Sequence, residues 1–325
     1  MRNAAGTRLS ESPHDHSGLA VANTIIPATK ELVIAAAARE PRQVIADFVA
    51  LTKPRVVVMV LVTTMVGYYV GLTAPPDYAR LLHLMFGTLL AAAGTLGLNQ
   101  YLEREVDGRM ARTRSRPLPD GRLQPLEALL FASAITLLGL ADLAVSVNAR
   151  AALVTAMIAV LYLGAYTPLK VRTPLCTLVG AVPGALPPVA GWAAARDDLA
   201  LGAWVLFGIM FLWQLPHTLA IARLYREDYA RAGVRVLPVV DAAGSSTERQ
   251  ILSGSLALVA VSLLPTLIGL AGGVYFTGAL ILGLGLVALG AAQARTPSIV
   301  SARRVMFASL FYLPALFALL AFDKL

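Results

Sequence analysis

Residues 81–123 read LLHLMFGTLLAAAGTLGLNQYLEREVDGRMARTRSRPLPDGRL, an apolar run that ends in a strongly charged segment. The apolar part is about 20 residues long, which is the length that a helix needs to cross a bilayer. Asn99, Glu103 and Asp107 follow one another at intervals of four residues, so they share one face if the helix continues. The stretch therefore predicts a membrane helix with a row of oxygen-bearing side chains at its end.

The composition of the whole chain is that of a membrane protein. Of its 325 residues, 57% are hydrophobic and only 14% are charged, and the mean hydropathy is +0.70. Apolar runs of about 20 residues recur, which predicts an all-α polytopic membrane protein surrounded by the lipid bilayer. Because the basic residues sit in loops between these runs, the net charge of +8 indicates topology and no nucleic-acid partner. The lone cysteine, Cys176, excludes an internal disulfide and a cysteine-based metal site.

Nine membrane spans are predicted, and the loops between them divide the basic residues unequally. The predicted spans are 55–74, 81–101, 125–147, 150–168, 174–194, 201–222, 251–271, 273–292 and 303–322. With the N-terminus in the cytoplasm, only Arg80, Arg150, Arg196 and Lys324 of the 27 Lys and Arg residues fall on the outer side. The positive-inside rule therefore predicts a cytoplasmic N-terminus and an outer C-terminus. Residues 1–47 are expected to form a disordered cytoplasmic tail, and residues 48–325 the transmembrane domain.

The charged end of the second span has two interpretations. Carboxylates and an amide on one face can bind a cation such as Mg²⁺, and the five arginines from Arg109 to Arg122 can pair with phosphate oxygens. Basic loops also occur simply as cytoplasmic anchors of membrane helices. Acidic residues contribute nothing to such anchoring, so the pattern favours a site for the metal diphosphate of a lipid-borne substrate.

Two further cytoplasmic segments carry charges that could complete this site. Glu227 and Asp228 lie in the second long loop, and Lys170 and Arg172 lie in the tight connection YTPLKVRTP. Two facing carboxylate clusters could hold two Mg²⁺ ions about one diphosphate, and the metal and cation charges would stabilise the departing anion. Solvated loop charges and helix anchors are the alternative interpretation of both segments.

Two features inside the spans indicate a pocket. The fifth span contains VGAVPGALPPVAGW, residues 179–192, and is broken by Gly and Pro. Irregular backbone is tolerated in lipid only where it is buried in protein or lines a cavity. His217 in the sixth span is an intramembrane ionisable residue and hence a functional candidate. It could contact an acceptor molecule or a haem iron, with a structural role as the alternative.

These blocks occur together in a known family. The motif N-x-x-x-E-x-x-x-D with the trailing RTRSRPLPDGRL resembles the UbiA-type intramembrane prenyltransferases. The blocks YTPLKVRTP, VGAVPGALPPVAGWAA, LPH and REDYARAGVRVLPVV, in this order, resemble the haem O synthase branch, which farnesylates haem. The resemblance extends over residues 48–322.

The resemblance implies a nine-helix bundle with a central cavity, in which residues 48–325 form the prenyltransferase domain. It implies Mg²⁺-assisted transfer of a farnesyl group from farnesyl diphosphate to the vinyl group of haem b, giving haem O and diphosphate. Its motif positions assign metal binding to Asn99, Glu103, Asp107, Glu227 and Asp228. The cations facing diphosphate would be Arg112, Arg116, Lys170 and Arg172. Catalysis would rest on Asn99, Glu103, Asp107, Asp228 and Lys170, with His217 binding the acceptor.

The chain departs from the family pattern at both metal motifs. In the first motif, Glu103 stands where the broader family often has Asp. The second motif commonly carries an acid four residues before Asp228, but Leu224 stands there in this chain. A related prenyltransferase acting on an aromatic acid or a quinone precursor is the nearest alternative function. A small-molecule transporter would fit the broken helices, although the charges gather at one end of the spans and not at the midplane. The expected location is the inner membrane of a bacterium, where a haem-modifying enzyme is a candidate partner.

Overall fold

The computed structural model describes residues 40–241 and 243–325. Within these ranges every regular element is a helix, and the β pairing is limited to one isolated bridge between Ala271 and Lys324. The all-α prediction is therefore confirmed. Residues 1–39 of the predicted tail lie outside the described residues, and helix α2 (Pro41–Leu51) follows them. The contacts discussed below lie within the compact unit Asp47–Leu325.

Nine helical segments of the described chain are long and apolar enough to cross a membrane, which confirms the predicted number. Six of them are single helices: α3 (Pro54–Gly71), α4 (Tyr78–Gly108), α5 (Pro125–Ser146), α10 (Leu201–Leu224), α15 (Gly273–Arg295) and α16 (Ile299–Phe322). The fourth span combines α6 (Ala149–Val160), the π-helical turn η1 (Leu161–Tyr166) and α7 (Thr167–Leu169). The fifth combines α8 (Cys176–Ala185) with α9 (Pro187–Arg196), and the seventh combines α13 (Ser245–Ser262) with α14 (Leu264–Leu267). Short helices α11 (Arg226–Arg231) and α12 (Leu237–Val240) lie between α10 and α13.

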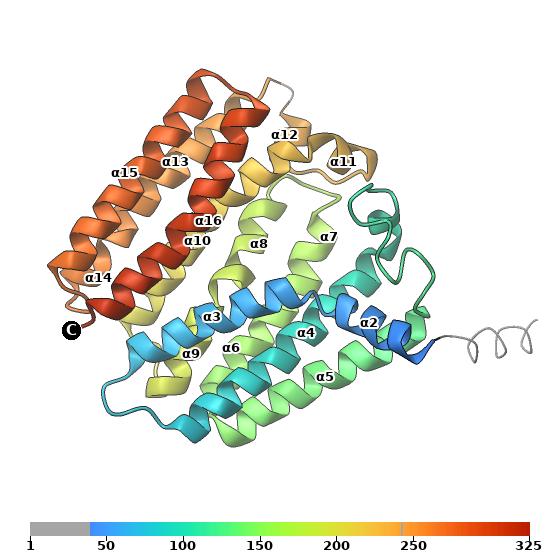
Figure 1. Cartoon of the computed structure of the whole chain (residues 1–325), viewed down its shortest axis with the longest axis horizontal. Helices are drawn as coiled ribbons and strands as arrows, with labels where there is room; N and C mark the ends of the chain where they lie inside the picture. Colours follow the sequence, from blue (N-terminus) through green and yellow to red (C-terminus); the bar gives the residue numbers. More distant parts are fainter. Residues whose placement is uncertain (1–39, 242) are drawn as a thin grey trace, which may run out of the picture. The chain divides into compact units, whose positions relative to one another are not determined.

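The bundle is built by packing of neighbouring and distant spans. Helix α4 lies along α5, and α3 lies along α9 (Figure 1). Helix α10 packs against α8, α13 and α16, and α15 packs against both α13 and α16. The largest buried apolar cluster includes Trp192, Leu206, Ile209, Tyr312 and Leu316. These side chains join the fifth, sixth and ninth spans, so the core reaches across the middle of the bundle.

The first and fifth spans approach each other through two glycines. A Cβ atom on Gly67 would lie 2.0 Å from the Pro188 carbonyl oxygen, and one on Gly191 would lie 1.9 Å from the Thr64 carbonyl oxygen. Small residues let membrane helices pack this closely. The contact therefore fixes the broken fifth span against the first span.

Helix α4 continues past the predicted end of its apolar part, residue 101, to Gly108. Leu, Glu and Arg, which favour helix, dominate the added segment, so the backbone stays helical after the apolar run has ended. The loop that follows, residues 109–124, contacts the second long loop through a cluster of Met110, Ala232 and Val234. The Arg235 amide also donates a 2.7 Å hydrogen bond to the Lys170 carbonyl oxygen. Three loops, 109–124, 170–175 and 225–244, thus meet at one end of the bundle, called here the loop end.

Candidate functional site

The predicted polar face of α4 is present and buried. Asn99, Glu103 and Asp107 expose 0%, 8% and 1% of their surface, whereas Glu105 is exposed. The spacing of four residues on a continuous helix accounts for this shared face. Charged groups are almost never buried unless they are paired, so these carboxylates require partners from other segments.

Two basic residues from different loops supply these partners. Lys170 Nζ lies 2.7 Å from Glu103 Oε1, and Arg116 Nη1 lies 2.6 Å from Asp107 Oδ2. Lys170 belongs to the connection after the fourth span, and Arg116 belongs to the loop after α4. The structure thus brings two of the predicted cations next to two of the predicted carboxylates.

Lys53, which the sequence analysis did not single out, completes the row. Its Nζ donates to Asn99 Oδ1 over 2.9 Å, and Asn99 Nδ2 donates to Thr167 Oγ1 over 3.1 Å. Lys53 has φ 52° and ψ 63°, a left-handed conformation that costs a residue other than glycine about 1–2 kcal/mol. The available sequence signal was a lysine directly before Pro54 at the start of the first span. Backbone strain of this kind often accompanies a functional position.

The pKa values of the two lysines in the row are shifted in opposite directions. Burial lowers the pKa of Lys53 to about 7, and the neighbouring charges of Arg116 and Lys170 act in the same direction. Burial also acts against the charge of Lys170, but Tyr166 and Glu103 outweigh it and raise the pKa of this ammonium. The ammonium lies 4.5 Å from the centre of the Tyr166 ring, a cation–π contact. Lys170 therefore carries a full positive charge at neutral pH.

The two acids of the second predicted motif, Glu227 and Asp228, differ in their surroundings in the structure. Asp228 Oδ1 accepts from the Ala111 amide over 3.4 Å and pairs with Arg231, so this carboxylate faces the loop that follows α4. Glu227 and Arg172 are exposed, and in the described chain neither makes a polar contact with the α4 row. Asp228 is thus brought to the first loop, while Glu227 and Arg172 are not.

Arg112, in the loop that follows α4, contacts two aromatic rings of the second long loop. Its guanidinium carbon is 5.3 Å from the ring centre of Tyr225 and 5.8 Å from that of Tyr229. Within the described residues it makes no ion pair with a carboxylate, so most of its N–H donors are free to meet an anion.

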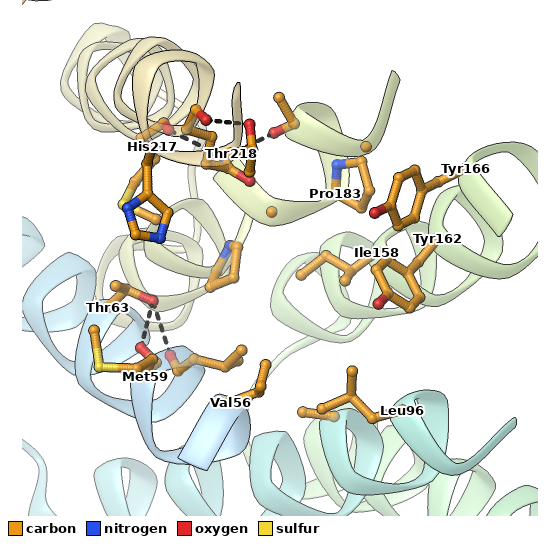
Figure 2. Close-up of a pocket in the computed structure, with 18 of the residues that line it drawn as sticks. Val56, Met59, Thr63, Leu96, Ile158, Tyr162, Tyr166, Pro183, His217 and Thr218 are labelled. Carbon is orange, nitrogen blue, oxygen red and sulfur yellow. Dashed lines mark hydrogen bonds between the residues drawn. The ribbon is translucent and has the colours of Figure 1, made fainter. Parts of the chain in front are cut away.

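A cavity of about 500 Å³ lies inside the bundle (Figure 2). Residues of α3, α4, α6, η1, α8, α9, α10, α11 and α16 line it, and most are apolar, as Val56 and Ile158 are. The broken fifth span contributes Pro183 and Pro187, which confirms that it lines a pocket. His217 is also in the wall, where Figure 2 shows its ring projecting into the cavity.

The polar row and the cavity adjoin each other. Thr95 lines the cavity one helical turn before Asn99 on α4, and Tyr166 lines it directly beneath the Lys170 ammonium. A molecule could therefore place an anionic group against the row and an apolar chain in the cavity.

The π-helical turn η1 shapes this junction. Tyr162 and Tyr166 project from it into the cavity, with ring centres 5.2 Å apart (Figure 2). Thr167 Oγ1 donates to the Tyr162 carbonyl oxygen, which links the turn to Asn99 through the Thr167 hydroxyl. Single π-turns are frequent at functional sites. Neither tyrosine was assigned a role from sequence, because one added residue in a helical turn leaves no periodic pattern.

The oxygen donors of the row fit a magnesium ion that is shared with a substrate. In the described part of the chain, no three His, Cys, Asp or Glu side chains gather closely enough to enclose an ion. Mg²⁺ commonly binds one or two carboxylates together with waters and substrate phosphates. Glu103, Asp107 and the Asn99 amide carry oxygen donors of this type.

Comparisons with known proteins agree in family and fold. Residues 60–313 match the UbiA prenyltransferase family. A protein named protoheme IX farnesyltransferase from Solibacter usitatus (strain Ellin6076) is 46% identical to this chain, covering 86% of this chain and 98% of that protein. Proteins of the same name from Koribacter versatilis (strain Ellin345) and Myxococcus xanthus (strain DK1622) are 40% and 41% identical, each covering 86% of this chain and 93% and 95% of their own length.

Solved structures share the fold at low sequence identity. A structure of digeranylgeranylglyceryl phosphate synthase has a TM-score of 0.74 and 18% identity, covering 86% of this chain and 98% of that one. A UbiA homologue from Archaeoglobus fulgidus bound to GPP and Mg²⁺ has a TM-score of 0.60 and 16% identity, covering 84% of this chain and 99% of that one. These two likenesses establish the helical architecture.

Proposed function

The chain belongs to the UbiA prenyltransferase family, and from this we propose that it transfers a farnesyl group from farnesyl diphosphate to the vinyl group of haem b. It is an intramembrane enzyme whose relatives at 38–46% identity are named protoheme IX farnesyltransferase. The observation that carries the proposal is the buried row of oxygens and cations at the edge of an apolar cavity. This arrangement suits a substrate with a charged head and a hydrocarbon chain. The products would be haem O and diphosphate.

Asn99, Glu103 and Asp107 are the residues that would hold Mg²⁺ with the diphosphate oxygens, and Asp228, with Glu227 beside it, would serve a second ion. The bound metal would neutralise charge that develops on the departing diphosphate. Arg116 and Lys170 already lie within 3 Å of these carboxylates, so an arriving diphosphate meets cations as well. Arg112, and Arg172 from the next loop, would add contacts at the outer edge.

The apolar wall supports the bond-making step by keeping bulk water out. When the bond between farnesyl C1 and its oxygen breaks, the electron pair leaves with diphosphate and an allylic carbocation forms. The vinyl π electrons of haem then form the new carbon–carbon bond, and a water adds to the resulting cation with loss of a proton. Tyr162 and Tyr166 present π faces to this region, and such faces stabilise cations. No nucleophilic side chain is required.

The test is an incubation of purified protein with haem b, farnesyl diphosphate and Mg²⁺, with and without EDTA, followed by mass analysis of the haem. A Mg²⁺-dependent gain of one farnesyl group plus water is expected. Unchanged haem, from folded protein that still cleaves farnesyl diphosphate, would overturn haem as the acceptor and leave an aromatic acid or quinone precursor as the candidate.

The loops and the family support a proposal for the location. We infer that the enzyme lies in the inner membrane of a bacterium, with a cytoplasmic N-terminal tail over residues 1–47 and an outer C-terminus. Basic residues collect in the loops of the loop end, which the positive-inside rule assigns to the cytoplasm. A haem-modifying enzyme is the partner that this chemistry suggests.

A further inference from the structure

The cavity continues from the polar row as a channel between α3 and α4. Lys53 and Asn99 are hydrogen-bonded at the row, and from there the two helices pack against each other and run antiparallel (Figure 1). Thr64 lies eleven residues beyond Lys53 on α3, and Thr88 lies eleven residues before Asn99 on α4. Both threonines line the cavity, so they lie at a similar depth, about 16 Å from the row.

Helix α6 forms the third wall of this channel. Thr167 contacts Asn99 at the row, and Thr155, twelve residues earlier in the same span, lines the cavity at a depth similar to that of the other two threonines. The side chains of Thr64, Thr88 and Thr155 are called here the threonine layer. Between the row and this layer the channel is lined mainly by apolar side chains, among them Val56, Val60, Ala92, Leu96 and Ile158 (Figure 2).

A buried apolar floor closes the channel directly beyond the threonine layer. The next turn of each helix contributes Tyr68, Leu84 and Ala151, which belong to one packed cluster with Ala193 and Ala194 of α9. Tyr68, Leu84 and Ala151 expose 2%, 0% and 0% of their surface. Of the described residues that line the cavity, none belongs to this cluster. The channel therefore has a defined length from the row to the floor.

This length matches that of a farnesyl chain. About twelve carbons lie in line in such a chain, and with bonds of about 1.5 Å they extend over about 14 Å. We propose that the farnesyl chain occupies this channel, and that the threonine layer and the floor residue Leu84 determine the length of the isoprenoid that is transferred. The inference rests on the proposed function. One further isoprene unit adds about 5 Å and would have to enter a close-packed cluster.

The size of the threonines can be varied separately from their polarity. The hydroxyls of Thr64 and Thr88 are buried, and within the described residues neither has a hydrogen-bond partner. Thr88→Val keeps nearly the same shape and removes a hydroxyl that is left unsatisfied, so it should not destabilise the fold. Thr88→Leu adds bulk at the same point and shortens the channel.

The test offers geranyl, farnesyl and geranylgeranyl diphosphates in competition to purified full-length protein with haem b and Mg²⁺, followed by mass analysis of the product haems. We expect the wild type to prefer farnesyl diphosphate. Thr88→Leu should lower the ratio of farnesyl to geranyl transfer by at least about tenfold, the usual effect of changing the size of an apolar pocket. Leu84→Ala opens the floor and should raise the ratio of geranylgeranyl to farnesyl transfer by at least about tenfold.

Two control variants separate channel length from other effects. Leu258→Ala makes the same truncation at a fully buried position outside the cavity wall and the floor, so its donor ratios should equal those of the wild type. Thr88→Val should shift the ratio of farnesyl to geranyl transfer less than Thr88→Leu does. Thr155→Leu fills the same layer from α6 and replaces the Thr88→Leu variant if that protein does not fold.

The outcomes distinguish this inference from the proposed function. Unchanged donor ratios in the folded threonine-to-leucine variant or in folded Leu84→Ala would overturn the inference, even if the wild type farnesylates haem. An equal shift in Thr88→Val or in Leu258→Ala would also overturn it, because the length of the channel would then not be the cause. Wild-type protein that transfers none of the three prenyl groups to haem would overturn the proposed function itself.

Discussion

Asp107 is the residue at which the proposed chemistry is most directly testable. Its side chain is buried, and one carboxylate oxygen lies 2.6 Å from Arg116. Asp107→Asn keeps the shape and removes the negative charge, so a metal diphosphate would lose one of the charged ligands proposed for it. We expect farnesyl transfer to haem to fall by at least about 100-fold, as it does when one electrostatic group of an active site is removed. Initial rates from mass analysis, with a melting curve for each variant, provide the measurement.

Glu105 offers the matched control for this prediction. It lies two residues before Asp107 on the same helix, but its side chain is exposed. Glu105→Gln makes the same chemical change outside the row, so the rate of farnesyl transfer should equal that of the wild type. A wild-type rate in folded Asp107→Asn protein would contradict the assignment of the α4 row.

Lys53 allows the contribution of an amine to be separated from that of a strained backbone. Lys53→Met removes the ammonium that donates to Asn99, and we expect the KM for farnesyl diphosphate to rise by at least about tenfold, the value of one charge-assisted hydrogen bond. Lys53→Gly removes the same ammonium and also relieves the left-handed strain, so it should show the same KM but melt no lower than Lys53→Met. A wild-type KM in Lys53→Gly would contradict the prediction, because it would show that the ammonium does not contribute to binding farnesyl diphosphate.

At the scale of elements, hydropathy predicted the spans, and packing determined their irregular parts. The nine apolar runs and the broken fifth span could be predicted because bilayer thickness and proline impose them locally. Helix α13 begins at Ser245, earlier than predicted, because its first turn is polar and escapes an apolar window. Helix α16 begins at Ile299, also before the predicted residue 303. The π-helical turn Leu161–Tyr166 and the contact of Lys53 with Asn99 depend on how distant segments pack, and no local pattern encodes them.

The start of α13 provides a prediction about pH. Asp241 accepts hydrogen bonds from the Gly244, Ser246 and Thr247 amides and from the Thr247 hydroxyl. Burial alone would raise the pKa of Asp241, but these hydrogen bonds outweigh it and lower the pKa below its usual value. The folded state therefore favours the carboxylate, and this stabilisation is present above the unfolded-state pKa and is lost as the pH falls through the folded-state pKa.

Asp241→Ala should accordingly lower the free energy of unfolding by about 1–2 kcal/mol at pH 7, the usual value of a helix-capping group. The difference in melting temperature from the wild type should shrink as the pH falls toward about 3, where the carboxylate is protonated in both states. Melting curves across this pH range measure it, with Glu105→Ala as the exposed control. A difference that stays constant with pH would show that the charge of Asp241 does not stabilise the helix.

At the scale of the whole molecule, the basic residues of the loops gather at one end of the bundle. The loop end carries the arginines that follow α4 and α10, whereas Arg80, Arg150, Arg196 and Lys324 lie at the ends of spans remote from those loops. Lys324 Nζ also donates to the carbonyl oxygens of Tyr69 and Leu72, so the end of the chain is tied to the end of the first span. The positive-inside rule predicts that the loop end, where these arginines and the α4 row lie, faces the cytoplasm.

The single cysteine makes this orientation measurable. Cys176→Ser leaves the chain without a thiol, and single cysteines can then be placed at exposed positions of opposite ends: Ser115→Cys in the loop after α4 and Ala74→Cys in the loop before it. In intact spheroplasts, a maleimide that does not cross membranes should label Ala74→Cys and spare Ser115→Cys, and both should react once the membrane is permeabilised. The reverse pattern would put the carboxylate row on the outer side, where cytoplasmic farnesyl diphosphate could not reach it, and would contradict the proposed orientation.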